Sequence, residues 1–211
     1  MLRDLLDALR CPRPHDESWL VAMVQRAEGA ELLEADLACP VCGAEFVIHE
    51  GIARFDPPVA PAPAVAIEAV RLAALLGVTE GQQPVLLAGV YADAGVALAE
   101  LVPVPQLWLN ARRTAPRPAT LVGALEVRGR VPLGVDTLAG AALDGAHSDV
   151  RMLDSVVRAV RRGGRLVAPA TALLPTGVQM VARDAHEQVA DVTTRASGLV
   201  ELRRRAPDQV G

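Results

Sequence analysis

The sequence predicts an α/β protein in two parts: a small N-terminal α+β module, then a larger, doubly wound and mostly parallel sheet. Four prolines fall within residues 56–63, a density that excludes helix and favours an extended linker. All three cysteines precede this linker. After it, short apolar runs alternate with helical patterns, as is typical of a sheet with helices on both faces. We therefore expect a module at 1–56, a linker at 57–63, an α/β domain at 64–205 and a tail at 206–211.

Composition narrows the functional classes. The chain has 211 residues, 51% of them hydrophobic but only 2% aromatic, so the core must consist mainly of Ala, Val and Leu. The absence of lysine excludes a Walker A phosphate loop and a lysine Schiff base. With 21 basic and 25 acidic residues, the charge balance does not favour nucleic-acid binding. We find no signal-peptide pattern and no apolar run of about 20 residues, so we expect a soluble, cytoplasmic protein without a membrane segment.

The N-terminal module begins with a helical pattern, because residues 2, 5, 6 and 9 are apolar and share one helical face. The segments 20–26 and 31–38 flank Glu28-Gly29, which favours a β-hairpin. By propensity alone, one continuous helix over this stretch is the alternative. A further apolar run at 46–48 follows the cysteine pair.

The cysteines predict a metal site. Cys39 and Cys42 are separated by two residues and followed by glycine, as in a metal-binding knuckle. Zinc requires four ligands in a tetrahedron, and Cys11 is a third candidate. A second Cys-x-x-Cys pair would need cysteine at position 14, where Pro14 stands, so His15 is the nearest fourth ligand. Two alternatives stay open: the three cysteines with another ligand, or a metal-free turn.

The pattern of this module resembles a known family. Leu5-Leu6-Asp7-x-Leu9-x-Cys11-Pro12, Leu37-x-Cys39-Pro40-x-Cys42-Gly43 and Ile48-x-x-Gly51-Ile52 are similar to the small zinc-ribbon activator subunit of tRNA and protein methyltransferases. The resemblance implies a helix followed by a short sheet, with a structural zinc or a relic zinc knuckle at one end. It also implies an apolar surface, which we expect to be covered within the chain or between two copies. A homo-oligomer such as a dimer, or another protein partner, is therefore expected.

The second domain is predicted element by element. An apolar helix over 65–76 ends at Gly77, and further helices are expected at 92–101 and 149–162. Asp149 caps the last of these, and Gly163-Gly164 stops it. Parallel strands are expected at 84–89, 106–109, 120–127, 137–143 and 165–168. Residues 177–182 and 199–202 form an expected antiparallel pair.

This order of elements resembles the class I S-adenosylmethionine-dependent methyltransferases, whose fold is Rossmann-like. The resemblance is carried by Arg161-Arg162-Gly163-Gly164-Arg165-Leu166-Val167 after an amphipathic helix, and by Leu138 to Asp144. It implies a glycine-rich cofactor loop after the first strand, because the backbone must approach the cofactor closely. S-adenosylmethionine and zinc are therefore the two cofactors to consider.

The expected cofactor loop departs from the family pattern. Gly89 fits the first glycine, but Tyr91 and Asp93 occupy the next two glycine positions. An alternative alignment takes Asp93 as the acidic residue and Gly95 as the glycine. Asn110 stands at the end of the second strand, where a carboxylate normally binds the ribose hydroxyls. These five residues are the cofactor-binding candidates if the chain binds S-adenosylmethionine.

We assign no catalytic residue from the sequence. Asp144 and His147 follow the fourth strand and are either an acid/base pair or the turn before a capped helix. Two functional hypotheses result. The favoured one is a pseudoenzyme, a non-catalytic methyltransferase-like scaffold or partner-binding protein with a structural zinc ribbon. The alternative is an active methyltransferase with an atypical cofactor loop.

Overall fold

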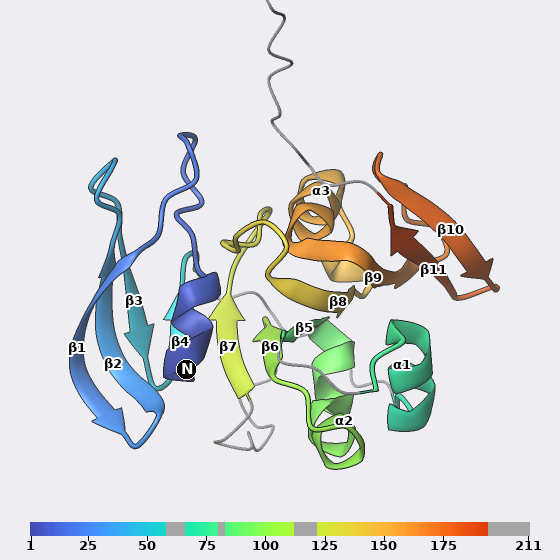
Figure 1. The fold of residues 1–211 in the computed structure, drawn as a ribbon, viewed down its shortest axis with the longest axis horizontal. Helices are drawn as coiled ribbons and strands as arrows, with labels where there is room; N and C mark the ends of the chain where they lie inside the picture. Colours follow the sequence, from blue (N-terminus) through green and yellow to red (C-terminus); the bar gives the residue numbers. More distant parts are fainter. Residues whose placement is uncertain (58–65, 80–82, 112–121, 194–211) are drawn as a thin grey trace, which may run out of the picture.

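The part of the chain that the structure describes forms one sheet of 11 strands (Figure 1). The computed structural model describes residues 1–57, 66–79, 83–111 and 122–193. The strand order is β1-β2-β3-β4-β7-β6-β5-β8-β9-β11-β10. The six central strands, from β4 to β9, are parallel, and the strands at both ends pair antiparallel. The expected mixed α/β fold with a large parallel sheet is confirmed.

The N-terminal module is a short helix followed by a four-stranded antiparallel meander. Its elements are η1 (Arg3–Ala8), β1 (Val21–Glu28), β2 (Glu31–Ala38), β3 (Glu45–His49) and β4 (Ile52–Arg54). The helix expected over 2–9 is a 3-10 helix. The hairpin is confirmed over the continuous-helix alternative, and Gly29 turns it with a φ of +58°. A positive φ is the conformation that glycine adopts without steric cost.

The second domain follows the expected order closely. Its first part contains α1 (Ala69–Leu76), β5 (Val85–Ala88), η2 (Gly89–Ala94), α2 (Gly95–Leu101), β6 (Gln106–Leu109) and β7 (Val122–Glu126). Its second part contains β8 (Leu138–Ala142), η3 (Gly145–His147), α3 (Val150–Ala159), β9 (Val160–Pro169), β10 (Val178–Arg183) and β11 (Glu187–Val192). The Asp149 cap is confirmed, because its carboxylate accepts from the amides of Arg151 and Met152.

The structure corrects the expected end of the last helix and the expected partner of β10. The helix α3 ends at Ala159, and the glycine pair 163–164 lies inside β9 instead of stopping the helix. A Cβ at Gly164 would lie 2.4 Å from the carbonyl oxygen of Ala139, so this glycine serves the close approach of β8 and β9. The partner of β10 is β11, and the expected strand at 199–202 lies outside the described residues. Most of the expected linker at 57–63 also lies outside them.

The two faces of the sheet carry separate layers. Leu72 from α1, Leu98 from α2 and Trp108 from β6 belong to the core on one face, and α3 packs on the other (Figure 1). The connection 127–137 between β7 and β8 is fully described and contains no helix. The N-terminal module, rather than a helix, covers the sheet at β7. A Cβ at Gly123 would lie 2.7 Å from the sulfur of Met1 and 2.8 Å from a methyl of Leu5.

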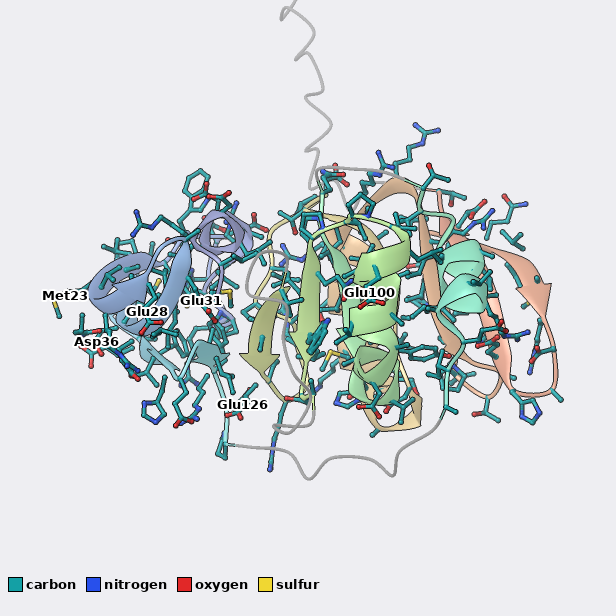
Figure 2. The ribbon with its side chains drawn as sticks, turned by 90° about the horizontal axis from the view of Figure 1, so that it is seen from below. Met23, Glu28, Glu31, Asp36, Glu100 and Glu126 are labelled. Atoms are coloured by element: carbon teal, nitrogen blue, oxygen red, sulfur yellow. The ribbon has the colours of Figure 1, made fainter. Side chains whose placement is uncertain are left out.

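The N-terminal module joins the parallel sheet directly. The strand β4 pairs in parallel with β7, with Ile52, Ala53 and Arg54 opposite residues 124–126. Arg54 Nε lies 3.1 Å from Glu126 Oε2 across this junction, where Figure 2 labels Glu126. One apolar face of the module, which carries Met1 and Leu5, is thus buried within the chain. Within the described residues, no helix is long and apolar enough to span a membrane.

Candidate functional site

The cysteine cluster lies at one end of the N-terminal module. The ligand atoms of Cys11, His15, Cys39 and Cys42 all lie within 4.8 Å of one another. Cys11 Sγ is 3.7 Å from Cys42 Sγ, and Cys39 Sγ is 3.4 Å from His15 Nε2. With Zn–S near 2.3 Å and Zn–N near 2.0 Å, a tetrahedral zinc would separate two sulfurs by about 3.8 Å and a sulfur from a nitrogen by about 3.5 Å. The four residues therefore fit a zinc ion.

The backbone prepares this cluster for a metal cation. Burial alone would raise the pKa of Cys39, but the amides of Cys42 and Val41 donate to its sulfur and lower the pKa to about 6. Burial raises the pKa of Cys11 to about 11, so its thiol needs a cation to become a thiolate. His15 Nδ1 lies 2.6 Å from the carbonyl oxygen of Asp16. A proton on Nδ1 leaves Nε2 free as a ligand, as second-shell contacts commonly arrange.

A second candidate site follows from the strand order. After β5 the chain moves to β6 and β7 on one side, and then crosses to β8 on the other side of β5. In open α/β sheets, ligands bind at such a switch point, beyond the carboxyl ends of the strands. Here those ends lead into Gly89 after β5, Asn110 after β6 and Asp144 after β8. The structure brings these three segments together.

Asp144 fills the space beside Gly89. Gly89 has a φ of +57°, and a Cβ built on it would lie 1.9 Å from Asp144 Oδ2. The same oxygen accepts a hydrogen bond of 3.0 Å from the amide of Val90. Gly89 thus allows a close approach, as the resemblance implied, but the group that approaches is a carboxylate of this chain. The sequence left Asp144 as either part of an acid/base pair or part of a turn, and it gave no sign of this contact.

His147 extends the contact to Asn110. His147 Nδ1 lies 2.6 Å from Asp144 Oδ1, and its Nε2 lies 3.0 Å from Asn110 Nδ2. Asn110 Oδ1 accepts the amide of Val127, which orients the Asn110 amide so that Nδ2 donates. The network thereby assigns the imidazole proton to Nδ1, since Nε2 must accept from Asn110. All three side chains are buried, and their network connects the carboxyl ends of β6 and β8.

The electrostatics favour an ionised Asp144. Burial raises the pKa of this carboxyl, but the hydrogen bond from His147 and those from the amides of Val90 and Ala146 outweigh it, so the pKa lies below its usual range. Of the two alternatives for this segment, the structure shows the turn, because Asp144 and His147 belong to the turn that precedes α3. Asp144 caps η3 through Ala146 and also holds His147. The polar atoms of Asp144 and His147 therefore make hydrogen bonds to other groups of this protein.

The remaining cofactor candidates lie apart from this network. The Tyr91 hydroxyl donates to Glu187 Oε2 over 3.0 Å, on the side of β11, and burial followed by Glu187 holds the pKa of Tyr91 well above its usual range. A Cβ at Gly95 would lie 2.6 Å from the Trp108 indole, so this glycine makes room for a buried ring. Asp93 is half-buried at the end of η2. Of the five candidates, Gly89 lies against Asp144 and Asn110 lies against His147.

No family model matches the chain, and no curated protein matches it. Solved structures that match part of the chain include a complex of the Haloferax volcanii Trm112 methyltransferase activator with a putative methyltransferase, at 12% identity and a TM-score of 0.46, covering 60% of this chain and 90% of that one. The YcgJ protein of Bacillus subtilis matches at 16% identity and a TM-score of 0.38, and a geranyl diphosphate methyltransferase complex with GPP and sinefungin at 16% and 0.40. Each covers 47% of this chain, which in turn spans 49% and 42% of their lengths.

Proposed function

We propose that this protein is a non-catalytic, methyltransferase-like scaffold with a structural zinc module. One observation carries the proposal: the Asp144 carboxylate occupies the space that Gly89 leaves open. A cofactor that follows the glycine loop needs this space for its own atoms, because the backbone approach is what the missing Cβ provides. Displacing Asp144 would cost free energy, because its carboxylate accepts hydrogen bonds from His147 and from two backbone amides inside the protein.

The end of β6 supports the same conclusion. Asn110 replaces the carboxylate that would bind the ribose hydroxyls, and both ends of its amide are occupied by Val127 and His147. A buried polar network whose members are all satisfied stabilises one arrangement of the chain. S-adenosylmethionine binding would have to break it and restore equivalent hydrogen bonds.

Calorimetric titration with S-adenosylhomocysteine tests the proposal directly. We expect no binding by the wild type, and none by a Tyr91→Phe control, which changes a hydroxyl directed away from the network. Asp144→Ala empties the space beside Gly89, so weak binding by this variant would identify the carboxylate as the obstacle. Micromolar binding by the wild type would overturn the scaffold and favour the alternative, an active methyltransferase.

The zinc part of the proposal has its own test. We expect one zinc per chain, held by Cys11, His15, Cys39 and Cys42, whose spacing supports a closed, structural site without an open coordination position. Metal analysis of protein purified without added zinc measures the ratio. A metal-free protein whose melting temperature does not change on treatment with a chelator would contradict the structural zinc.

A scaffold needs a surface for a partner, and we propose the outer edge of β1 as the contact with a second copy. β1 is the first strand in the sheet order, and Met23 projects from it at the end of the molecule (Figure 2). Trp19, Val21 and Met23 alternate along the chain and are 66%, 61% and 64% exposed. An unpaired strand edge with apolar side chains favours pairing with another strand. Sedimentation should show a dimer that Met23→Arg dissociates, whereas a wild-type monomer would refute this contact.

A further inference from the structure

A basic groove lies between the zinc cluster and the parallel sheet, apart from the Asp144 network. It has a volume of about 240 Å³ and combines residues from five separate segments. Its lining residues are Pro12, Arg13, Phe46, Phe55, Asp56, Arg128, Gly129, Arg130 and Arg151. Four arginines around one small groove stand out in a chain whose formal net charge is −4. The charge balance of the whole sequence therefore conceals a local positive site.

Three of the four groove arginines have no acidic side chain within ion-pair distance among the described residues. Within the described residues, no carboxylate oxygen lies within ion-pair distance of Arg13, Arg130 or Arg151, although other arginines of the chain have such partners. Asp56 is the only acidic residue among those that line the groove, and its Oδ2 accepts from the backbone amide of Arg128 over 2.8 Å. Three exposed guanidinium groups around one hollow favour an anion.

The position of the groove in the fold fits a bound ligand. Phe55 and Asp56 follow β4, and residues 128–130 follow β7, so both segments extend from the carboxyl ends of parallel strands. Arg151 belongs to the first turn of α3, and the chain after β7 runs toward α3 (Figure 1). The carboxyl ends of parallel strands and helix N-termini are the places where α/β proteins bind anionic ligands.

The loop that carries two of the arginines is held rigidly. Asn110 donates through Nδ2 to the carbonyl oxygen of Val127 over 2.8 Å, and its Oδ1 accepts the Val127 amide over 3.0 Å. The residue at the expected ribose-binding position thus fixes the start of the segment 128–130. A fixed loop binds with a lower entropic cost than a loop that must be ordered by the ligand.

Two aromatic rings also line the groove. Phe46 and Phe55 have ring centroids 4.9 Å apart at an interplanar angle of 41°. Both rings line the hollow that the arginines surround. Aromatic rings beside guanidinium groups favour a ligand with a flat apolar ring and a phosphate, and the volume limits it to about the size of one nucleotide.

We propose that this groove binds a nucleoside monophosphate group, with the phosphate at Arg13, Arg130 and Arg151 and the base against the phenylalanine pair. The site is separate from the cofactor crevice, so it stands whether or not the scaffold function is correct. The same group can come from a free nucleotide or from the phosphorylated end of an RNA. The chemistry of recognition is the same for both sources.

The experiment measures binding of fluorescently labelled AMP to the full-length protein at about 50 mM salt, a concentration at which phosphate contacts are strong. We expect saturable binding that unlabelled AMP displaces. Adenosine should not displace it, and inorganic phosphate should displace it only weakly. Arg151→Glu and Arg130→Glu should each weaken binding at least about tenfold, because each removes a charge-assisted contact. The control Arg183→Glu, on the exposed strand β10, makes the same charge change elsewhere and should leave binding unchanged.

A 5′-phosphorylated trinucleotide and its unphosphorylated form distinguish the two sources. If the phosphorylated form displaces AMP and binds more tightly, an RNA end is the source; if AMP binds more tightly, the source is a free nucleotide. The proposal is overturned if the wild type does not bind AMP, if Arg183→Glu weakens binding as much as Arg151→Glu, or if adenosine competes as well as AMP. Circular dichroism of each variant shows that the fold is intact.

Discussion

Replacing Gly89 by alanine should destabilise the protein far more than replacing Gly145. Both glycines are neighbours of Asp144, Gly89 in space and Gly145 in the sequence. At Gly89 the φ is +57°, and the new Cβ would meet Asp144 Oδ2 at 1.9 Å. An alanine at positive φ costs about 1–2 kcal/mol. Displacing the carboxylate also weakens its hydrogen bond from Val90, at about 1.5–3 kcal/mol for a charged acceptor. The expected loss is therefore about 2.5–5 kcal/mol, from a total stability of about 5–15 kcal/mol for a typical domain.

Urea unfolding followed by circular dichroism measures this difference. Gly145→Ala is the matched control, because a Cβ there meets nothing within 4 Å and the φ is not positive. We expect this control to stay within about 1 kcal/mol of the wild type. Combining Gly89→Ala with Asp144→Ala should cost less than the sum of the two single changes, since the second removes the atom that clashes. Equal losses at both glycines, or strict additivity in the double variant, would refute the contact between Gly89 and Asp144.

Three further outcomes are expected. Gly95→Ala should lower stability by about 1–3 kcal/mol in thermal unfolding, because its Cβ would overpack the buried indole of Trp108 at 2.6 Å. Cys39→Ser should reduce zinc content and abolish the effect of a chelator on the melting temperature, whereas an unchanged zinc content would refute Cys39 as a ligand. The pKa of Asp144 is lower in the folded state than in the unfolded state. The ionised carboxylate therefore stabilises the fold fully above the unfolded pKa of about 3.9, and this stabilisation is lost as pH falls through the folded pKa. The stability difference between wild type and Asp144→Asn should accordingly shrink below about pH 4.

Local sequence signals account for most of the elements. Segment 106–109 is a strand with the expected bounds, and Gly77 ends α1 in the left-handed conformation. The helix α3 shows the limit of such signals. The run Val160-Arg161-Arg162 continues the helical pattern, but the chain already pairs with β8 at Val160. Pairing in a sheet is a long-range interaction, and it overrides the helix propensity of a few residues.

Local sequence patterns likewise identified one of the candidate sites and missed the other contacts, which depend on the tertiary fold. The four zinc-ligand candidates were found from spacing, because a knuckle and a nearby histidine are local patterns in the chain. The contact of Asp144 with Gly89 joins residues 55 positions apart and depends on the strand order, so no spacing rule could indicate it. The basic groove was missed for the same reason. Its arginines come from separate segments and are inconspicuous in a sequence with 21 basic residues.

The proline-rich boundary separates two sequence patterns, but we infer that it does not separate two folding units. The connection between β7 and β8 lacks a helix, so without the N-terminal module the sheet face at Gly123 would be open to water. Met1 and Leu5 of the module cover that face, and β4 pairs with the edge of β7. Without the module, the sheet would expose to water both the unpaired edge of β7 and an apolar face, and each exposure is unfavourable. A zinc ion bound by this cluster, as proposed above, would then stabilise the whole sheet, because it would tie the segment after η1 to the turn between β2 and β3, and both of these pack within one core.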